Sequence, residues 1–230
     1  MISNELEIKP LRIAIVIPAF NESESISEVV KRISVFGLAI VVNDGSIDNT
    51  QQLALEAGAL VVSHEVNRGY DIALASGLAK ALEEEFDFAI TMDGDGQHEP
   101  ARIESFLCEL LDGADLVVGM RDRFQRVSET LFAFFARLFW GISDPLCGMK
   151  GYRLSKLKGI GSLCSYASIG TELTIRAVRS GWNVRQVFVK TRDRKDKSRF
   201  GAGIVANWLI FRAMMLGIFL ARAHNKIKIY

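Results

Sequence analysis

Residues 12–22 read RIAIVIPAFNE, and this stretch decides the fold. RIAIVI (12–17) is rich in Ile and Val, which is typical of a buried strand of a parallel sheet. A polar loop follows directly, and Ser25 with Glu28 has the spacing of a capping box at the start of an amphipathic helix. The stretch therefore reads as the first strand, loop and helix of an α/β fold.

Similar units follow along the chain. Further strands are predicted at AIVV (39–42), ALVV (59–62), FAITM (88–92) and DLVVG (115–119), with helices at about 50–57, at about 70–84 and after Pro100. This alternation predicts a doubly wound, mostly parallel sheet with right-handed crossovers and helices on both faces.

After residue 119 the pattern changes. We predict an apolar helix over 129–142, a strand or hairpin at 149–154, a helix over 172–180, a strand at 184–189, a basic loop, and an apolar helix over 204–221. The expected organisation is one α/β domain over residues 1–201 and an apolar, basic helical extension over residues 202–230.

Composition excludes several classes of protein. With 49% hydrophobic residues in 230, the chain is not disordered. Cys108, Cys147 and Cys164 have neither zinc-ligand spacing nor the pattern of a disulfide framework, which favours a reducing compartment. The opening residues MISNELEIKPLR lack the apolar segment of a signal peptide, so we expect a cytoplasmic location.

Charge is divided unevenly along the chain. Residues 185–230 carry eleven basic and two acidic side chains, a net +9, which leaves −8 on the rest of a chain whose formal charge is +1. Because the basic tail is also apolar, we expect it to contact the cytoplasmic face of a membrane and expect no nucleic-acid partner. A solvated charged face is the alternative.

Two apolar helices are candidates for that membrane contact. The helix over 204–221 is long enough nearly to span a bilayer, but Arg212 lies near its middle, and a central arginine costs roughly 2.5–3.5 kcal/mol. We therefore expect it to lie at the membrane surface or to pack on the domain. The second candidate is the helix that contains Phe132, Phe134, Phe135, Phe139 and Trp140. Ordinary core packing is the alternative for both.

Polar loops follow three of the predicted strands. They are 18–22 (PAFNE), 43–46 (NDGS) and 93–98 (DGDGQH). Ligands of open α/β sheets bind beyond the carboxyl ends of the strands, so the three loops are expected to form one site. The sequence contains neither G-x-G-x-x-G after the first strand nor G-x-x-x-x-G-K-[ST], which argues against a dinucleotide site and a P-loop.

Asp93 and Asp95 are the strongest local signal. Two carboxylates two residues apart face the same way and suit Mg²⁺ or Mn²⁺, which would neutralise a leaving diphosphate. An EF-hand is disfavoured because His98 occupies its glycine position and Pro100 follows. Helix capping by both aspartates stays open. Asp44 is expected to accept a hydrogen bond from a nucleobase, with an Asx turn as the alternative.

Seven motifs, in order, carry a resemblance to a known family: IVIPAFNE, VVNDGSIDNT, NRGYDIAL, TMDGDGQHEP, GMRDR, DPLCGMKGYR and KSRFG. Together they resemble the family 2 glycosyltransferases of GT-A fold, and among these the branch of dolichyl-phosphate mannose synthase and bacterial polyprenyl-phosphate sugar synthases. The resemblance covers nearly all of residues 12–201. It implies a cytoplasmic, membrane-peripheral transferase that uses a nucleotide-diphosphate sugar and inverts the anomeric centre.

The resemblance also implies roles for individual residues. The donor would be bound by Pro18, Phe20 (against the base), Glu22, Asp44, Asp93 and Arg199. The metal would be held by Asp93, Asp95 and Gln97, and the catalytic residues would be Asp95, Asp144 and Arg121. The acceptor phosphate would be bound by Arg121, Arg123, Arg153, Arg194 and Lys197. The family often has tyrosine at Phe20 and aspartate at Asn43. Asp71 replaces a residue that is usually small.

The chemical class of the acceptor determines which catalytic groups the site needs. A hydroxyl acceptor needs a general base, whereas a phosphate monoester, with a second pKa of about 6, is already dianionic and needs cations to orient it. Seven arginines beyond residue 120 suit a phosphate: 121, 123, 126, 153, 192, 194 and 199. Asp144 then has two interpretations, a base for a hydroxyl or an organiser of neighbouring arginines.

Four functions follow in order of preference. The first is sugar transfer to a polyprenyl phosphate, and the second is transfer to a carbohydrate hydroxyl. The third is a non-catalytic subunit that binds a nucleotide sugar or anchors a membrane partner protein. The fourth is a nucleotidyltransferase, which also uses a carboxylate pair on an α/β sheet.

Overall fold

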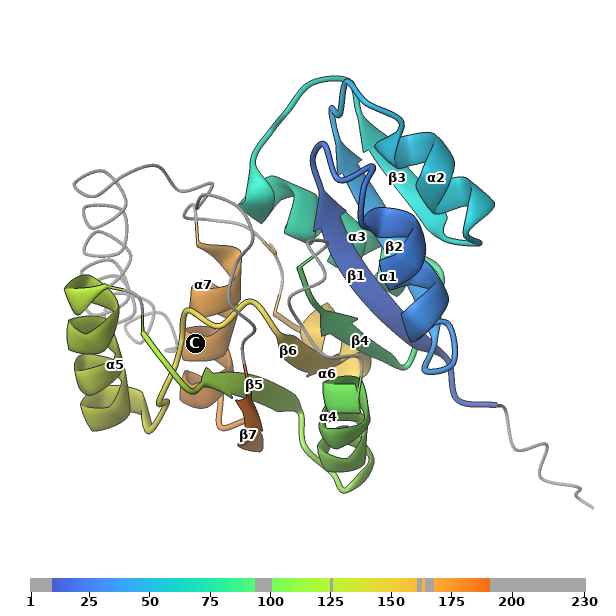
Figure 1. Ribbon diagram of the computed structural model, residues 1–230. Helices are drawn as coiled ribbons and strands as arrows, with labels where there is room; N and C mark the ends of the chain where they lie inside the picture. The colour runs from blue at the N-terminus through green and yellow to red at the C-terminus, as the bar shows by residue number, and fades with distance from the viewer. Residues whose placement is uncertain (1–9, 94–100, 125, 161–162, 164–167, 191–230) are drawn as a thin grey trace, which may run out of the picture.

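The computed structural model describes residues 10–93, 101–124, 126–160, 163 and 168–190. Within them one sheet has the strand order β3-β2-β1-β4-β6-β5-β7 (Figure 1). Its strands are β1 (Ile13–Ala19), β2 (Leu38–Asp44), β3 (Leu60–His64), β4 (Phe88–Thr91), β5 (Leu116–Arg121), β6 (Lys150–Arg153) and β7 (Val184–Val189). Strand β6 is antiparallel to β4 and β5, and the other pairings are parallel. The prediction of a mostly parallel sheet is confirmed.

Helices cover both faces of this sheet. They are α1 (Ile26–Ile33), α2 (Thr50–Glu56), α3 (Tyr70–Glu83), α4 (Ala101–Leu111), α5 (Val127–Trp140), α6 (Leu154–Lys158) and α7 (Ile169–Arg179). One core lies between the sheet and α1, α2 and α4, and a second lies under α3, α6 and α7 (Figure 1). Strand β1 serves both, because Ile15 and Ile17 face the first core while Ala14 and Val16 face the second. The doubly wound architecture is confirmed.

The sheet brings the functional segments to one edge. Strands β1, β2 and β4 end there at Ala19, Asp44 and Thr91, and β5 ends there at Arg121. Because β6 runs in the opposite direction, its first residue, Lys150, pairs with Thr91 at the same edge. The segment 144–149 that precedes β6 therefore joins the three predicted loops.

Two details differ from the sequence predictions. Ser25 precedes α1 but makes no capping bond, because its hydroxyl lies 3.4 Å from the Glu22 carbonyl and 3.3 Å from the Glu22 carboxylate. The predicted capping box is therefore wrong. The strand expected at 149–154 is the antiparallel β6, and its last residue is followed at once by α6.

The helix predicted over 204–221 lies outside the described residues, as does the whole of 191–230. Among the helices that the structure describes, none combines the length and the hydropathy that crossing a bilayer requires.

Candidate functional site

The loops after β1 and β2 are tied together by side chains. The Asn21 amide donates to Ser46 Oγ at 3.0 Å, and Asn21 Oδ1 accepts from the Ile47 amide at 3.0 Å. Asn21 has φ +54°, a left-handed conformation that asparagine tolerates. The Glu22 amide donates to Thr50 Oγ1 at 2.8 Å. The two loops therefore form one rigid unit at the carboxyl edge of the sheet.

Three predicted donor-binding residues lie in or next to this unit. Pro18 is buried within β1, Phe20 is half-buried directly after the strand, and Glu22 is buried at the start of the turn into α1. The structure thus places all three at the carboxyl end of β1, as expected of a nucleotide-binding loop. Their contact with a nucleotide stays a prediction.

Asp44 is buried at the end of β2 and accepts three hydrogen bonds. The donors are the Arg68 amide at 2.9 Å, the Gly69 amide at 2.8 Å and the His64 ring Nδ1 at 2.6 Å. The Asx turn considered for Asp44 is not formed, because the Ser46 amide donates to Asn43 Oδ1 at 3.2 Å instead. Asp44 is thus a fixed, internally bonded carboxylate.

Gly45 explains how the loop after β3 comes so close to Asp44. Its φ is +71°, and a Cβ at this position would lie 2.5 Å from the Asn67 nitrogen and 2.5 Å from the Val66 carbonyl carbon. Only glycine satisfies both constraints. The Asp-Gly pair therefore serves to bring the Arg68 and Gly69 amides onto the carboxylate.

Asp93 follows β4 at the same edge and lies beside Gly148 and Tyr70. A Cβ on Gly148 would lie 3.2 and 3.3 Å from the two Asp93 carboxylate oxygens and 3.2 Å from the Tyr70 hydroxyl. Burial, together with the Asp93 charge, raises the pKa of Tyr70 well above its ordinary value. The Thr91 hydroxyl donates to the Gly148 carbonyl at 2.7 Å. The segment that contains Gly148 thus packs directly against the first predicted metal ligand.

The fit to a divalent metal rests on the chemistry of the predicted ligands. Asp93 supplies a hard carboxylate at the correct edge of the sheet, as Mg²⁺ or Mn²⁺ requires. Asp95 and Gln97 lie outside the described residues. Within the ranges that the structure describes, no three His, Cys, Asp or Glu side chains are grouped to hold a metal. The residue that is described fits the expected ion.

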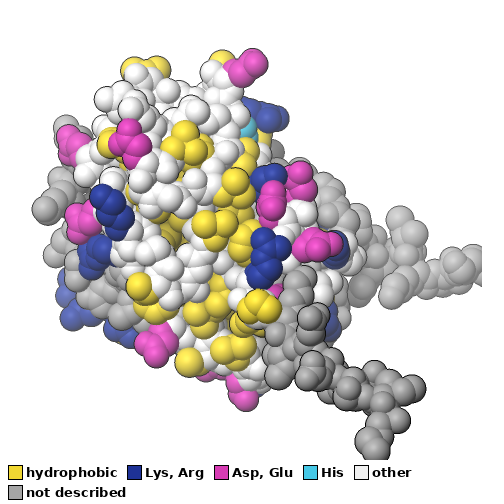
Figure 2. Space-filling view, turned by 90° about the vertical axis from the view of Figure 1, so that its right-hand side faces the viewer, with side chains coloured by type: hydrophobic (Ala, Val, Ile, Leu, Met, Phe, Trp, Pro, Cys, Tyr) yellow, Lys and Arg dark blue, Asp and Glu magenta, His cyan; other side chains and the backbone are white. Residues whose placement is uncertain are grey.

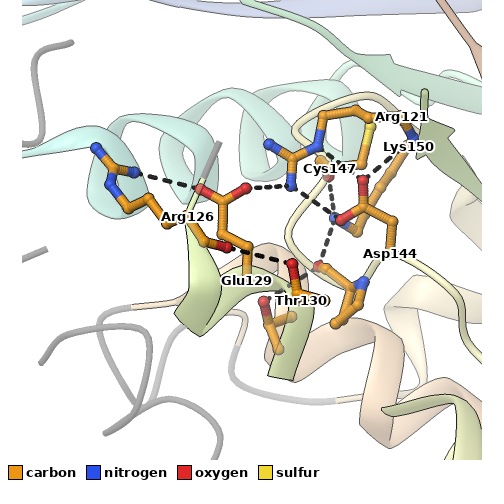
Figure 3. A network of polar contacts seen from close by, with 9 residues as sticks. Arg121, Arg126, Glu129, Thr130, Asp144, Cys147 and Lys150 are labelled. Carbon is orange, nitrogen blue, oxygen red and sulfur yellow. Dashed lines mark hydrogen bonds and ion pairs between the residues drawn. The ribbon is translucent and has the colours of Figure 1, made fainter. Parts of the chain in front are cut away.

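Arg121 and Asp144 form a two-pronged ion pair at the end of β5 (Figure 3). Arg121 Nε donates to Asp144 Oδ2 at 2.7 Å, and Nη2 donates to Oδ1 at 3.0 Å. The Arg121 backbone amide adds a third bond to Oδ2 at 3.2 Å. Burial lowers the pKa of Arg121, but the bonds to Asp144 outweigh it and the net shift is upward. Arg121 is therefore permanently charged.

Glu129 on α5 extends this pair into a network. Its carboxylate, 4% exposed as a residue, lies 3.4 Å from Arg121 Nη2 and 3.3 Å from Arg126 Nη1 (Figure 3). Arg121 Nη1 takes part in no hydrogen bond or ion pair with the described residues. Arg123, two residues further on, is exposed. The network thus holds Arg121 in place, with its guanidinium carbon 5.8 Å from the centre of the Phe124 ring, and leaves Nη1 unpaired among the described residues.

Lys150 fixes the segment that carries Asp144. Its buried amine donates to the carbonyl of Pro145 at 3.1 Å and to that of Cys147. Thr171 Oγ1 on α7 also donates to the Pro145 carbonyl, at 3.2 Å. Burial lowers the pKa of Lys150 and raises that of the Cys147 thiol to about 11. Cys147 is therefore a packed thiol at neutral pH and not a nucleophile.

Arg153 does not belong to this site, and the prediction that it binds the acceptor phosphate is wrong. It pairs with Phe88, the first residue of β4, because β6 is antiparallel. Its side chain donates to the Leu110 and Ala114 carbonyls and stacks over the Phe88 ring. The motif DPLCGMKGYR thus crosses the whole sheet, with Asp144 at the functional edge and Arg153 at the other.

Asp71, which the sequence left without an explanation, joins two helices. Its Oδ1 accepts from the amide of Ile169, the first residue of α7, at 2.7 Å. Burial raises its pKa, and the charge of Glu172 acts in the same direction. An unpaired amide at a helix N-terminus needs an acceptor, and Asp71 supplies it from α3.

Several residues were not predicted as members of the site. They are His64, Tyr70, Glu129, Gly148 and Lys150. Gly148 and Lys150 lie in a motif that the sequence had drawn attention to, whereas His64 and Glu129 had no local signal. The remaining predicted site residues, Asp95, Gln97, Arg194, Lys197 and Arg199, lie outside the described ranges.

Comparison with known proteins agrees with this architecture. Residues 14–161 match the family described as Glycosyl transferase family 2. The chain is 26% identical to the UDP-N-acetylglucosamine–dolichyl-phosphate N-acetylglucosaminyltransferase of Methanococcus voltae over 89% of this chain and 95% of that one. It is also 26% identical to the undecaprenyl-phosphate mannosyltransferase of Micrococcus luteus, over 87% of this chain and 92% of that one.

Among solved structures, it is similar to glucosyl-3-phosphoglycerate synthase from Mycobacterium tuberculosis in complex with Mn²⁺, UDP and phosphoglyceric acid. The TM-score is 0.71 and the identity 25%, covering 90% of this chain and 78% of that one. These findings agree with the GT-A fold and with the polar edge described above. The chain belongs to glycosyl transferase family 2 and is a glycosyltransferase.

Proposed function

We propose that this glycosyltransferase moves a sugar from a UDP- or GDP-sugar to a polyprenyl phosphate, with Mg²⁺ or Mn²⁺ and with inversion, at the cytoplasmic face of a membrane. The observation that carries the proposal is the Arg121–Asp144 pair. Both Asp144 oxygens accept from Arg121, so this carboxylate is an organiser of the arginine and not an unpaired base. A site without that base suits an acceptor that is already an anion.

The donor half of the site lies on β1, β2 and β4. Phe20 would stack on the base and Asp44 would accept a base N–H, with Pro18 and Glu22 shaping the loop. A metal held by Asp93, Asp95 and Gln97 would supply positive charge to the departing diphosphate. The Mycobacterium tuberculosis structure contains Mn²⁺ with UDP, which supports the choice of ion. Asp93 has the further task of holding the donor.

The acceptor half lies around the end of β5. Arg121 Nη1, which the described network leaves unused, and the exposed Arg123 would bind the acceptor phosphate. Arginine suits this task because its donors match phosphate oxygens in pairs. Arg194, Lys197 and Arg199 would close over the two phosphates. The printed names of the Methanococcus voltae and Micrococcus luteus relatives include a polyprenyl phosphate, which supports the lipid acceptor.

A stripe on α5 supports the membrane location. Val127, Leu131, Phe134 and Leu138 follow one another at spacings of four, three and four residues and are 87%, 46%, 63% and 66% exposed. This spacing places them on one side of the helix, while Phe132 and Ala136 on the other side are buried. An apolar stripe next to the acceptor arginines suits an acceptor whose chain lies in a bilayer.

The side of the molecule opposite α5 carries a different mixture of side chains. On the face that carries α1 and α2, Figure 2 shows acidic and basic side chains interspersed among apolar ones. That face is typical of a solvated surface. We therefore propose that the α5 stripe, together with residues 202–230, contacts the membrane and that a membrane partner protein, if present, binds there too.

A water-soluble acceptor is the second candidate. The Mycobacterium tuberculosis neighbour is named as a synthase of glucosyl-3-phosphoglycerate, and its complex holds phosphoglyceric acid. That acceptor also carries a phosphate, so the same arginines would orient it. The two candidates differ in whether the product partitions into organic solvent.

The deciding experiment is a donor panel with total membrane lipid as acceptor. UDP- and GDP-sugars labelled in the sugar are incubated with the full chain and Mg²⁺ or Mn²⁺, and lipids are extracted. A labelled organic-phase product that disappears with EDTA and with Asp95→Ala, but not with the control Asp112→Ala at the other edge of the sheet, supports the proposal. Metal-dependent release of UDP or GDP without a lipid product would point to a soluble acceptor.

A further inference from the structure

A chain of hydrogen bonds runs from Asp44 through His64 to Ser76. The register of β2 and β3 pairs Asp44 directly with His64. His64 Nδ1 lies 2.6 Å from Asp44 Oδ1, and His64 Nε2 lies 3.0 Å from Ser76 Oγ on α3. The Asp44 and His64 side chains are only 5% and 6% exposed. Such a buried chain holds the imidazole, and through it the carboxylate, in one orientation.

The positions of the protons follow from the partners. An ionised carboxylate only accepts, so His64 Nδ1 must carry the proton that it shares with Asp44. In the neutral imidazole Nε2 is then an acceptor, which suits the Ser76 hydroxyl as donor. Asp44 thus selects the tautomer with Nδ1–H, and Ser76, whose hydroxyl can donate or accept, is compatible with it.

The open positions on the Asp44 carboxylate can be counted. Each carboxylate oxygen has two lone-pair positions. Those of Oδ1 are filled by His64 Nδ1 and the Arg68 amide, whereas from the part of the chain that the structure describes Oδ2 receives only the Gly69 amide. One acceptor position, on Oδ2, is left for a ligand.

We infer that His64 is a positioning residue that sets base specificity, because it leaves Asp44 a single acceptor position that fits uracil and not guanine. The inference rests on the proposed function, in which Asp44 accepts a hydrogen bond from the base.

Uracil presents one ring N–H between two carbonyls. Guanine presents two adjacent donors, N1–H and the 2-amino group, which need both oxygens of a carboxylate. Cytosine and adenine place a ring lone pair beside their amino group, and it would repel Asp44. The expected donor is therefore a UDP-sugar.

Two substitutions at His64 separate its two hydrogen bonds. In His64→Asn the amide nitrogen takes the position of Nδ1, so the donor to Asp44 is kept and the Ser76 contact is lost. In His64→Gln the amide nitrogen takes the position of Nε2, so the Ser76 contact is kept and Oδ1 loses its donor. Ser76→Ala removes only the Ser76 hydroxyl, the last member of the hydrogen-bond chain from Asp44 through His64.

The test measures UDP and GDP binding to the full chain by calorimetry with Mn²⁺, together with donor KM, kcat and thermal unfolding. We expect the parent chain to bind UDP at least about tenfold more tightly than GDP, the value of one hydrogen bond to a charged group. His64→Gln is expected to raise the donor KM about tenfold with kcat little changed and to reduce the preference for UDP. His64→Asn should stay within about threefold of the parent chain.

Three results would overturn the inference. The first is equal binding of UDP and GDP by the parent chain, and the second is an unchanged donor KM in His64→Gln. The third is an equal loss in His64→Asn and His64→Gln that follows their loss of thermal stability, since that pattern marks a purely structural histidine. Failure of the proposed function looks different. A chain that prefers UDP but glycosylates no polyprenyl phosphate leaves the inference standing, whereas efficient lipid glycosylation from a GDP-sugar, a fourth result against the inference, leaves the proposed function standing.

Discussion

Asp144 and Arg121 meet through two parallel hydrogen bonds, Nε to Oδ2 at 2.7 Å and Nη2 to Oδ1 at 3.0 Å, with the aspartate residue only 1% exposed. Arg121 ends β5, and Asp144 lies in the segment before β6, so the pair joins two parts of the chain at the functional edge. Breaking such a pair leaves a buried charge without its partner, which is costlier than removing both.

Asp144→Asn is expected to lower the free energy of unfolding by about 3–5 kcal/mol, because the guanidinium loses its nearer counter-ion and keeps only Glu129 at 3.4 Å. We also expect kcat to fall by about a hundredfold or more, since the arginine is no longer held. Denaturant unfolding and initial rates measure the two effects.

The double variant Asp144→Asn with Arg121→Met separates the two interpretations of Asp144. If the aspartate acts only through Arg121, the activity of the double variant should equal that of the worse single variant. Multiplicative losses would instead assign Asp144 an independent chemical role and contradict its assignment as an organiser.

Gly148→Ala should impair activity without unfolding the protein. The new Cβ would lie 3.2–3.3 Å from the Asp93 carboxylate oxygens and from the Tyr70 hydroxyl, so these groups must move by a few tenths of an ångström. Displacement of Asp93, the proposed metal ligand, should lower kcat about tenfold or more. Gly159→Ala is the matched control, because among the described residues its Cβ meets only the Lys156 carbonyl, at 3.4 Å. Equal activity of the two variants would show that Asp93 tolerates the contact.

The α5 stripe should be needed for membrane binding and not for folding. Phe134→Ser with Leu138→Ser is expected to reduce sedimentation with anionic liposomes several-fold, because each loses roughly 1.5–3 kcal/mol of apolar burial in the bilayer surface. Thermal unfolding should barely change, since both side chains are solvent-exposed. Leu55→Ser, at a 52% exposed leucine on α2, is the matched control. If both proteins sediment alike, α5 does not lie on the membrane.

The lowered pKa of Asp48 predicts that the protein loses stability in acid. Burial disfavours its charge, but hydrogen bonds from Thr50 and Ser23 outweigh this effect and lower its pKa from 3.8 to about 2. Between these pH values the unfolded chain binds more protons, so stability is fully present above pH 3.8 and is lost as the pH falls toward 2. Allowing for solvent screening, we expect a loss of about 1 kcal/mol.

Asp48→Asn should remove that part of the acid dependence. Urea unfolding at several pH values between 2 and 5 measures it. A parallel pH dependence in the variant and the parent chain would assign the acid loss to other carboxylates.

The sequence by itself determined the strands, most of the helices and the edge of the sheet that carries the site. Runs such as IAIVI (13–17) face both cores of the sheet and so are apolar at every position, which makes strand and strand end visible without a structure. Parallel strands end at a common edge, so the loops at Glu22, Asp44 and Asp93 had to meet there. The membership of these loops in one site therefore followed from local pattern and chain direction alone.

Only the tertiary structure decided which side chains complete that site. His64 reaches Asp44 through the register of two strands, and Glu129 reaches Arg121 through the packing of α5. The antiparallel direction of β6 brings Lys150 to the functional edge and carries Arg153 away from it, although only two residues separate them in the motif. Register, strand direction and helix packing depend on contacts between residues distant in the chain, and no local pattern of residue types encodes them.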